Sequence, residues 1–126
     1  MLTKLFGHVS RRDVLFSGLH APAANTAAVI TLAASPGFHH VIHAIQWSYS
    51  GTAPTTGRLT IAVNAVTKWD VDVTALGPGG FQVTIAGAAN QAVVVTLAAG
   101  GAGATGKVNI QYTTESARAD AKLNHG

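Results

Sequence analysis

The stretch Arg58-Leu-Thr-Ile-Ala-Val-Asn-Ala-Val-Thr-Lys-Trp-Asp-Val-Asp-Val-Thr74 decides the fold class of this chain. Apolar side chains alternate with polar or small ones on both sides of Asn64-Ala65. An alternation with a period of two places one set of side chains on the buried face of a β-strand. Here the expected inward set is Leu59, Ile61, Val63, Trp69, Val71 and Val73. Two such runs joined by a short Asn-containing connection predict a β-hairpin.

Similar segments fill the chain on both sides of this hairpin, with Gly, Pro, Asn and Thr clusters between them. Turn clusters are expected at Ser35-Pro36-Gly37, at residues 77–80 (Gly-Pro-Gly-Gly) and at residues 100–106. β-Branched residues dominate, and no segment keeps an apolar repeat of 3.6 residues, so helix is not expected. The expected strands span residues 13–19, 26–33, 38–50, 58–64, 67–74, 81–85, 92–98 and 107–112.

The fold class that we predict is all-β, a single eight-stranded β-sandwich over residues 13–114. The strand count favours a jelly roll over an immunoglobulin-like sandwich. An extended N-terminal arm (residues 1–12) and a C-terminal tail (residues 115–126) flank the sandwich. In the long segment 38–50 we expect Val41, Ile45, Trp47 and Tyr49 to share one face with His39 and His43, because all of them have odd numbers.

Charge is unevenly distributed along the chain. Of the 13 Lys, Arg, Asp and Glu residues, five lie between residues 14 and 114, namely Arg58, Lys68, Asp70, Asp72 and Lys107. A typical domain carries about 25% charged residues. A body so poor in acids and bases disfavours an enzyme. It favours a protein whose neutral faces pack against copies of itself in a symmetric assembly.

The ends of the chain hold most of the basic residues. Clustered Lys and Arg with interleaved aromatics, the pattern of a nucleic-acid surface, are missing from the body, so we expect no direct nucleic-acid binding. No stretch reaches the ~20 apolar residues of a membrane span. Arg11-Arg12 before Val14-Leu15-Phe16 resembles a twin-arginine export signal, but the apolar run is short and enters an expected strand. We therefore interpret this segment as a basic arm.

The histidine run His39-His40-x-x-His43 is a candidate metal site. On a strand, side chains four residues apart lie about 13 Å from each other, and adjacent ones point to opposite faces. The run therefore needs ligands from other strands, and His20 and His125 are candidates to contribute one. Polar residues at the start of a strand or near a subunit contact are the preferred interpretation. There is no Cys, and we expect no metal and no cofactor.

Asp70 and Asp72 lie two residues apart on one strand, about 6.5 to 7 Å from each other. That separation is close to that of an inverting glycosidase pair, but two carboxylates alone supply neither a calcium site nor a catalytic cleft. We expect a solvated or interfacial face. The glycine-rich segment 100–106 resembles a phosphate cradle only superficially, because Gly106-Lys107-Val108 opens a strand instead of a helix. A loop between strands explains it better.

Trp47 and Tyr49 are a candidate sugar-stacking platform. Their alternation with Val41 and Ile45 directs them inward instead, so we expect core packing, the commoner role of large aromatics. Carbohydrate binding remains the second functional hypothesis.

Three segments carry a family resemblance: residues 40–51 (His-Val-Ile-His-Ala-Ile-Gln-Trp-Ser-Tyr-Ser-Gly), residues 57–61 (Gly-Arg-Leu-Thr-Ile) and residues 103–112 (Gly-Ala-Thr-Gly-Lys-Val-Asn-Ile-Gln-Tyr). They resemble small structural proteins of tailed bacteriophages, and most of all the jelly-roll head decoration or cement proteins. The likeness extends over roughly residues 15–113 and is one of general style.

This resemblance implies a structural virion protein, made in the host cytoplasm, that binds the outside of the phage head and stabilises the shell. It implies the major capsid protein as partner and a homo-oligomer, with a trimer preferred. Under this hypothesis the arm contacts the capsid or a neighbouring subunit through Leu2, Leu5, Phe6, Arg11 and Arg12. The alternative is a carbohydrate- or receptor-binding module of a phage fibre or spike.

Overall fold

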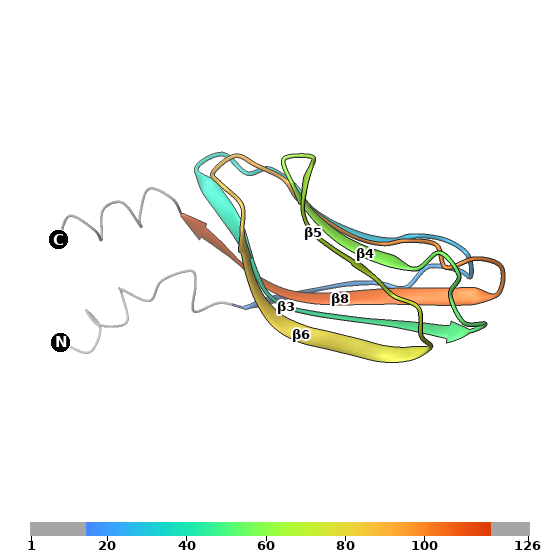
Figure 1. The fold of residues 1–126 in the computed structure, drawn as a ribbon. Helices are drawn as coiled ribbons and strands as arrows, with labels where there is room; N and C mark the ends of the chain where they lie inside the picture. Colours follow the sequence, from blue (N-terminus) through green and yellow to red (C-terminus); the bar gives the residue numbers. More distant parts are fainter. Residues whose placement is uncertain (1–14, 117–126) are drawn as a thin grey trace, which may run out of the picture.

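The computed structural model describes residues 15–116, which form two four-stranded antiparallel sheets packed face to face. Figure 1 shows the two layers, with β3, β6 and β8 in one and β4 and β5 in the other. The eight strands are β1 (Phe16–His20), β2 (Ala28–Leu32), β3 (Phe38–Gly51), β4 (Arg58–Val63), β5 (Val66–Asp72), β6 (Gly77–Ala86), β7 (Val93–Leu97) and β8 (Ala104–Ser116). The first sheet has the order β1-β8-β3-β6 and the second β2-β7-β4-β5.

This strand order is that of a jelly roll. The strands pair as β1 with β8, β2 with β7, β3 with β6 and β4 with β5, always antiparallel. The chain is therefore arranged as one long hairpin, with β4–β5 at its tip, that has been rolled into two sheets. The predicted β-sandwich is confirmed, and the strand order distinguishes it from an immunoglobulin-like arrangement.

The hairpin at the tip has the predicted geometry. Asn64 and Ala65 have φ angles of 50° and 65°, the left-handed conformation of a tight two-residue connection. The inward residues Leu59, Ile61 and Val63 of β4 are buried. Of the inward set expected for the next strand, only part is covered: Trp69 is half-buried and Val71 is exposed on β5, while Val73, just after the end of β5, is buried.

The core lies between the sheets and consists mainly of aliphatic side chains from both of them. Tyr49 is its largest member, and its hydroxyl donates a hydrogen bond to the carbonyl oxygen of Ala98. Burial raises the pKa of the Tyr49 phenol. Trp47 packs against the same cluster. Core packing, which the alternation predicted for both aromatics, is confirmed.

A β-bulge between Ile42 and Ala44 corrects the predicted inward face of β3. Before the bulge the core face carries even-numbered residues, including Ile42, while after it the core face carries Ile45 and Tyr49. The uninterrupted alternation predicted that His39, Val41 and His43 share the face of Tyr49, but they lie on the opposite face. A bulge adds one residue to one strand and so exchanges the two faces beyond it.

The expected turn at residues 77–80 is in fact the start of β6. Gly77, Pro78, Gly79 and Gly80 pair with Tyr49, Ser48, Trp47 and Gln46. β6 is at the edge of its sheet, so the missing N–H of Pro78 can be tolerated there. A Cβ atom on Gly79 would lie 2.6 Å from the Trp47 ring, and glycine leaves this space to the indole.

At the other end of the chain, β8 starts at Ala104, inside the segment expected as a loop, and continues to Ser116. It therefore includes two residues of the predicted tail. Residues 1–14 and 117–126 lie outside the described part of the chain, and with them the predicted arm and the interface residues Leu2, Leu5, Phe6, Arg11 and Arg12.

Candidate functional site

The histidines of the 39–43 run have separate structural contacts. His40 is buried, and its Nε2 donates to the carbonyl oxygen of Ala33 at 2.7 Å. Its Nδ1 lies 2.9 Å from the hydroxyl of Thr114, within hydrogen-bond distance. His20 accepts a hydrogen bond from the backbone N–H of Val29. His40 and His20 therefore fix backbone segments in place.

His43 belongs to a small polar network on the outer face of the first sheet. Thr113 donates its hydroxyl proton to Glu115 at 3.0 Å, so His43 Nε2, 2.9 Å away, must donate to Thr113. The Nε2 atom of His39 lies 3.7 Å from the Oε1 atom of Glu115. The Thr113 side chain is buried, which leaves its hydroxyl no access to a substrate. Within residues 15–116, no group of three or more His, Cys, Asp and Glu side chains is arranged to hold a metal ion.

The two aspartates of β5 are exposed, as predicted. Asp70 accepts two hydrogen bonds from the guanidinium of Arg58 on the neighbouring strand β4. These bonds lower the pKa of Asp70 and raise the pKa of Arg58. A carboxylate committed to a neighbouring arginine is a poor general acid, so the pair acts as a cross-strand link between β4 and β5.

The glycine-rich segment supports the end of the sandwich. Gly100 and Gly103 accept backbone hydrogen bonds from the N–H groups of Thr55 and Thr52, and the N–H of Gly101 donates to the side chain of Asn25. Gly101 and Gly103 have φ angles of 106° and 80°, which favour glycine. The segment is therefore a connection that joins three loops.

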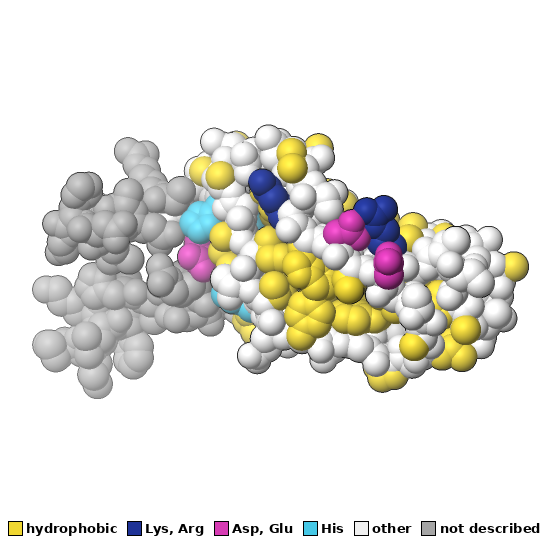
Figure 2. All heavy atoms as spheres, viewed as in Figure 1, with side chains coloured by type: hydrophobic (Ala, Val, Ile, Leu, Met, Phe, Trp, Pro, Cys, Tyr) yellow, Lys and Arg dark blue, Asp and Glu magenta, His cyan; other side chains and the backbone are white. Residues whose placement is uncertain are grey.

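The first candidate binding surface is an open edge of the sandwich, between the edge strands β5 and β6. Three aromatic rings meet there: Trp47 and Phe81 with centroids 5.5 Å apart, and Trp69 and Phe81 with centroids 4.8 Å apart. Phe81 is 39% exposed, and both tryptophans are half-buried. We call these three residues the aromatic edge. Figure 2 shows hydrophobic side chains gathered over this region of β5 and β6.

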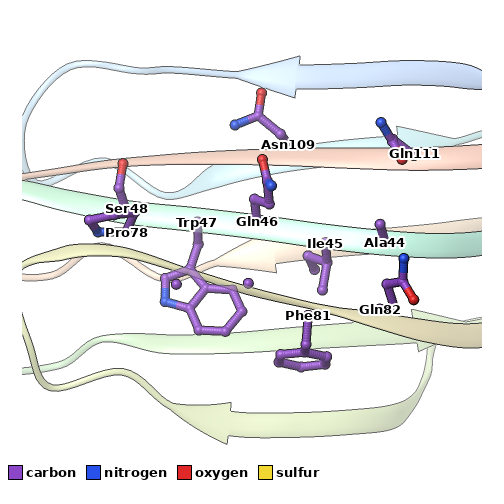
Figure 3. A pocket seen from close by; sticks show the side chains of 12 residues that line it. Ala44, Ile45, Gln46, Trp47, Ser48, Pro78, Phe81, Gln82, Asn109 and Gln111 are labelled. Atoms are coloured by element: carbon purple, nitrogen blue, oxygen red, sulfur yellow. The ribbon is translucent and has the colours of Figure 1, made fainter.

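The second candidate surface is a groove on the outer face of the first sheet. Four carboxamide side chains line it, from β3, β6 and β8: Gln46, Gln82, Asn109 and Gln111. Figure 3 shows Gln46, Asn109 and Gln111 on the opposite side of the sheet from Trp47 and Phe81. We call this surface the amide groove.

Small residues make the amide groove hollow. Ala44 and Gly80 lie among the amides, and the hollow has a volume of about 640 Å³. An adjoining hollow of about 420 Å³ shares Ala44, Gln46, Asn109 and Gln111 and extends to Ser17 and Leu19 on β1. The groove therefore crosses all four strands of the sheet.

Asn109 and Gln111 alternate with Val108, Ile110 and Tyr112, which places them on the polar face of their strand but assigns them no function. The amides come from segments far apart in the chain, and only the strand order brings them together. The aromatic edge was missed for the same reason, since nothing in the alternation of β5 or β6 indicates which edges stay open. No described residue belongs to a helix long and apolar enough to cross a membrane.

Comparison with known proteins finds solved structures of similar fold, but it finds no matching family. No family model and no curated protein matches the chain. Among solved structures, it is similar to the core of Drosophila NLP, with 10% identity over 79% of this chain and 96% of that one and a TM-score of 0.49.

Two further structures match over a comparable share of this chain. A CBM36 domain of a xylanase from the hindgut metagenome of Trinervitermes trinervoides shares 10% identity over 79% of this chain and 95% of that one, with a TM-score of 0.40. Dimeric latent PorU from Porphyromonas gingivalis shares 7% identity over 81% of this chain, with a TM-score of 0.48, and the chain spans 13% of its length. At identities of 7 to 10%, these likenesses indicate nothing beyond the β-sandwich fold.

Proposed function

We propose that this protein is a structural subunit of a virion, a decoration or cement protein on the outside of a tailed-bacteriophage head. The observation that carries the proposal is the aromatic edge on a body almost without charge. Residues 15–116 include six Lys, Arg, Asp and Glu side chains, and Arg58 and Asp70 neutralise each other. We assign the protein no catalytic role and no cofactor.

The aromatic edge supports contact with another copy of the chain. Burying a half-exposed aromatic ring removes apolar surface from water, at about 25 cal/mol per Å². β5 and β6 are also edge strands, and each has a row of backbone N–H and C=O groups without a partner in its own sheet. A neighbouring subunit that covers this edge would bury the aromatic rings and also supply hydrogen-bond partners for the backbone groups. The proposed assembly is a homo-oligomer, with a trimer as the expected state.

The partner that we propose is the major capsid protein, in keeping with the resemblance to head decoration proteins. The protein is then made in the host cytoplasm and located on the capsid exterior, with neither a membrane nor nucleic acid as a partner. The arm at residues 1–12, with Leu2, Leu5, Phe6, Arg11 and Arg12, is assigned to the capsid contact. Many copies at weak individual sites would stabilise the shell through multivalent attachment.

The mass of the full chain in solution tests the contact between subunits. We expect an oligomer in sedimentation velocity, and we expect the double variant Trp69→Ser/Phe81→Ser to sediment as a monomer at micromolar concentration. The matched control is Leu19→Ser, which removes a side chain that is 64% exposed on β1, at the opposite edge. The control should remain oligomeric. A monomeric wild-type chain, or dissociation by both variants alike, would exclude the aromatic edge as the interface.

Attachment to a shell tests the virion assignment separately. We expect the full chain to co-purify with capsid shells and to be visible on them by electron microscopy. Deleting residues 1–12 should leave the circular dichroism spectrum unchanged and reduce the number of copies per shell. Unchanged occupancy would remove the arm from the contact, and a failure of the full chain to bind shells would reject the virion role.

A further inference from the structure

The Asn and Gln side chains of the described residues fall into two groups. Asn25, Asn90 and Gln91 accept hydrogen bonds from the backbone N–H groups of Gly101, Gly37 and Ala88, so they stabilise loops. Asn64 forms the hairpin turn. The remaining four are the side chains of the amide groove: Gln46, Gln82, Asn109 and Gln111.

None of these four carboxamides makes a side-chain hydrogen bond with a described residue. The loop amides show that this sequence uses Asn and Gln to stabilise its own backbone where that is needed. The amides of the groove have no such structural task. Their donors and acceptors are directed to the outside of the sheet, where a ligand can use them.

The chemistry of the groove selects the class of ligand. A carboxamide offers two N–H donors and a carbonyl acceptor without a net charge. The charged residues of this outer face lie toward the ends of β8: Lys107 at one end, and Glu115 beside Thr113 and His39 at the other. The centre is therefore neutral and polar. An apolar ligand would cover the amides without satisfying them, which is costly, and an ion would find no opposite charge.

We propose that the amide groove binds a neutral oligosaccharide. Sugar hydroxyls both donate and accept hydrogen bonds, so one ring can satisfy amides from two neighbouring strands. Adjacent strands lie about 4.8 Å apart, so the groove across β1, β8, β3 and β6 extends over roughly 14 Å, the length of a short oligosaccharide. This surface is distinct from the Trp47 and Tyr49 platform, because Tyr49 is buried and Trp47 points to the other side of the sheet.

Binding to a single groove is weak. Two aromatic residues, Trp47 and Phe81, belong to its lining, but their rings point to the other side of the sheet. Among the described residues, the stacking that commonly strengthens sugar contacts is therefore missing, and the expected dissociation constant is on the order of 1 mM. An assembly of many subunits would raise the effective affinity by avidity. That gain rests on the proposed oligomer, whereas binding to the single groove does not.

The test follows the side-chain NH₂ resonances of the full-length, ¹⁵N-labelled protein by NMR. The probes are xylohexaose, cellohexaose, maltohexaose and mannohexaose, each up to 10 mM, with a hyaluronan hexasaccharide as the charged comparison. We expect at least one neutral probe to shift the amide signals of Gln46, Asn109 and Gln111. The signals of Asn25 and Asn90, which stabilise loops, should stay in place.

Variants make the result specific. Gln46→Ala/Asn109→Ala should weaken binding of the active probe at least tenfold. The matched control Thr60→Ala/Thr96→Ala changes two half-buried residues that pair across the second sheet, and it should bind like the wild type. Three results would overturn the proposal: no shift with any neutral probe, shifts confined to the indole signals of the aromatic edge, or equal losses in both double variants. Sedimentation of the same samples reports the oligomer independently.

Discussion

The two edges of this sandwich differ in how they are closed. At one edge β1 packs against β2, and Gly18 brings them together: a Cβ atom there would lie 3.2 Å from Ile110 and 3.3 Å from Ile30. At the other edge the rings of Trp47, Trp69 and Phe81 fill the space between β6 and β5 and remain partly exposed. The size of the side chains at the margin therefore decides whether this sandwich closes on itself or keeps apolar surface for a partner.

The largest expected difference between the edges is in their contribution to the free energy of unfolding. Ile30→Ala, near the closed edge, removes a side chain buried in the core and should cost about 2–5 kcal/mol. Phe81→Ala, at the open edge, should cost about 1–2 kcal/mol in the isolated subunit, because the ring is already 39% exposed. Urea denaturation of dilute protein measures both. Equal losses would mean that the open edge is part of the stabilising core.

Two glycine variants, one at each edge, should change the free energy of unfolding by intermediate amounts. Gly79→Ala places a methyl group 2.6 Å from the Trp47 ring and should cost about 1–3 kcal/mol, with a red shift of Trp47 emission in a Trp69→Phe background. Gly18→Ala meets Ile110 and Ile30 at distances that require shifts of a few tenths of an ångström, and it should cost less than about 1 kcal/mol. An unchanged emission spectrum in the Gly79 variant would contradict the position of the indole.

The smallest expected effect is that of the ion pair between Arg58 on β4 and Asp70 on β5, the strand at the open edge. The hydrogen bond from Arg58 lowers the pKa of Asp70, so the ionised carboxylate favours the folded state. This contribution is fully present above the pKa of an unfolded aspartate, about 3.9, and is lost as the pH falls through the lower folded value. Both side chains are exposed, so the effect should be small.

Asp70→Asn tests this link between β4 and β5. Below pH 4 the wild type should lose the stability that the ionised Asp70 provides, whereas the variant has no such contribution to lose. Thermal unfolding of both proteins between pH 2 and 6 measures the difference. In 1 M NaCl the wild type and the variant should converge because salt screens exposed charges. An identical pH profile of the two proteins at low salt would show that the pair does not contribute.

Much of the fold could be predicted because alternation is local. The β4–β5 hairpin, with its connection at Asn64-Ala65, needed only the residues between Arg58 and Thr74. The face of β3 could not be predicted in the same way, because the bulge near Ala44 leaves no mark in a run of apolar and polar residues. At residues 77–80, Gly and Pro indicated a turn, but an edge strand tolerates both.

The candidate surfaces depended on non-local information. Gln46 and Asn109 are paired across β3 and β8, although 63 positions separate them in the chain. Their outward positions could be predicted from the sequence, but their position side by side on neighbouring strands could not. One signal was available: the outward positions of three segments hold Gln or Asn, where β-strands more often carry Thr or Val. The aromatic edge left no such signal, because Trp69 and Phe81 alternate as ordinary inward residues.

The pairing of the first strand with the last has a consequence for how the protein folds. Phe16 pairs with Tyr112, so β1 stays without its neighbour in the sheet until residue 112 has left the ribosome. The β4–β5 hairpin can form much earlier, and each further pair encloses a longer loop than the one before. Folding should therefore proceed from the middle of the sequence outward and be slow, as is usual for proteins dominated by distant contacts. Joining β1 to β8 is then the last step, and it also completes the sheet that carries the amide groove.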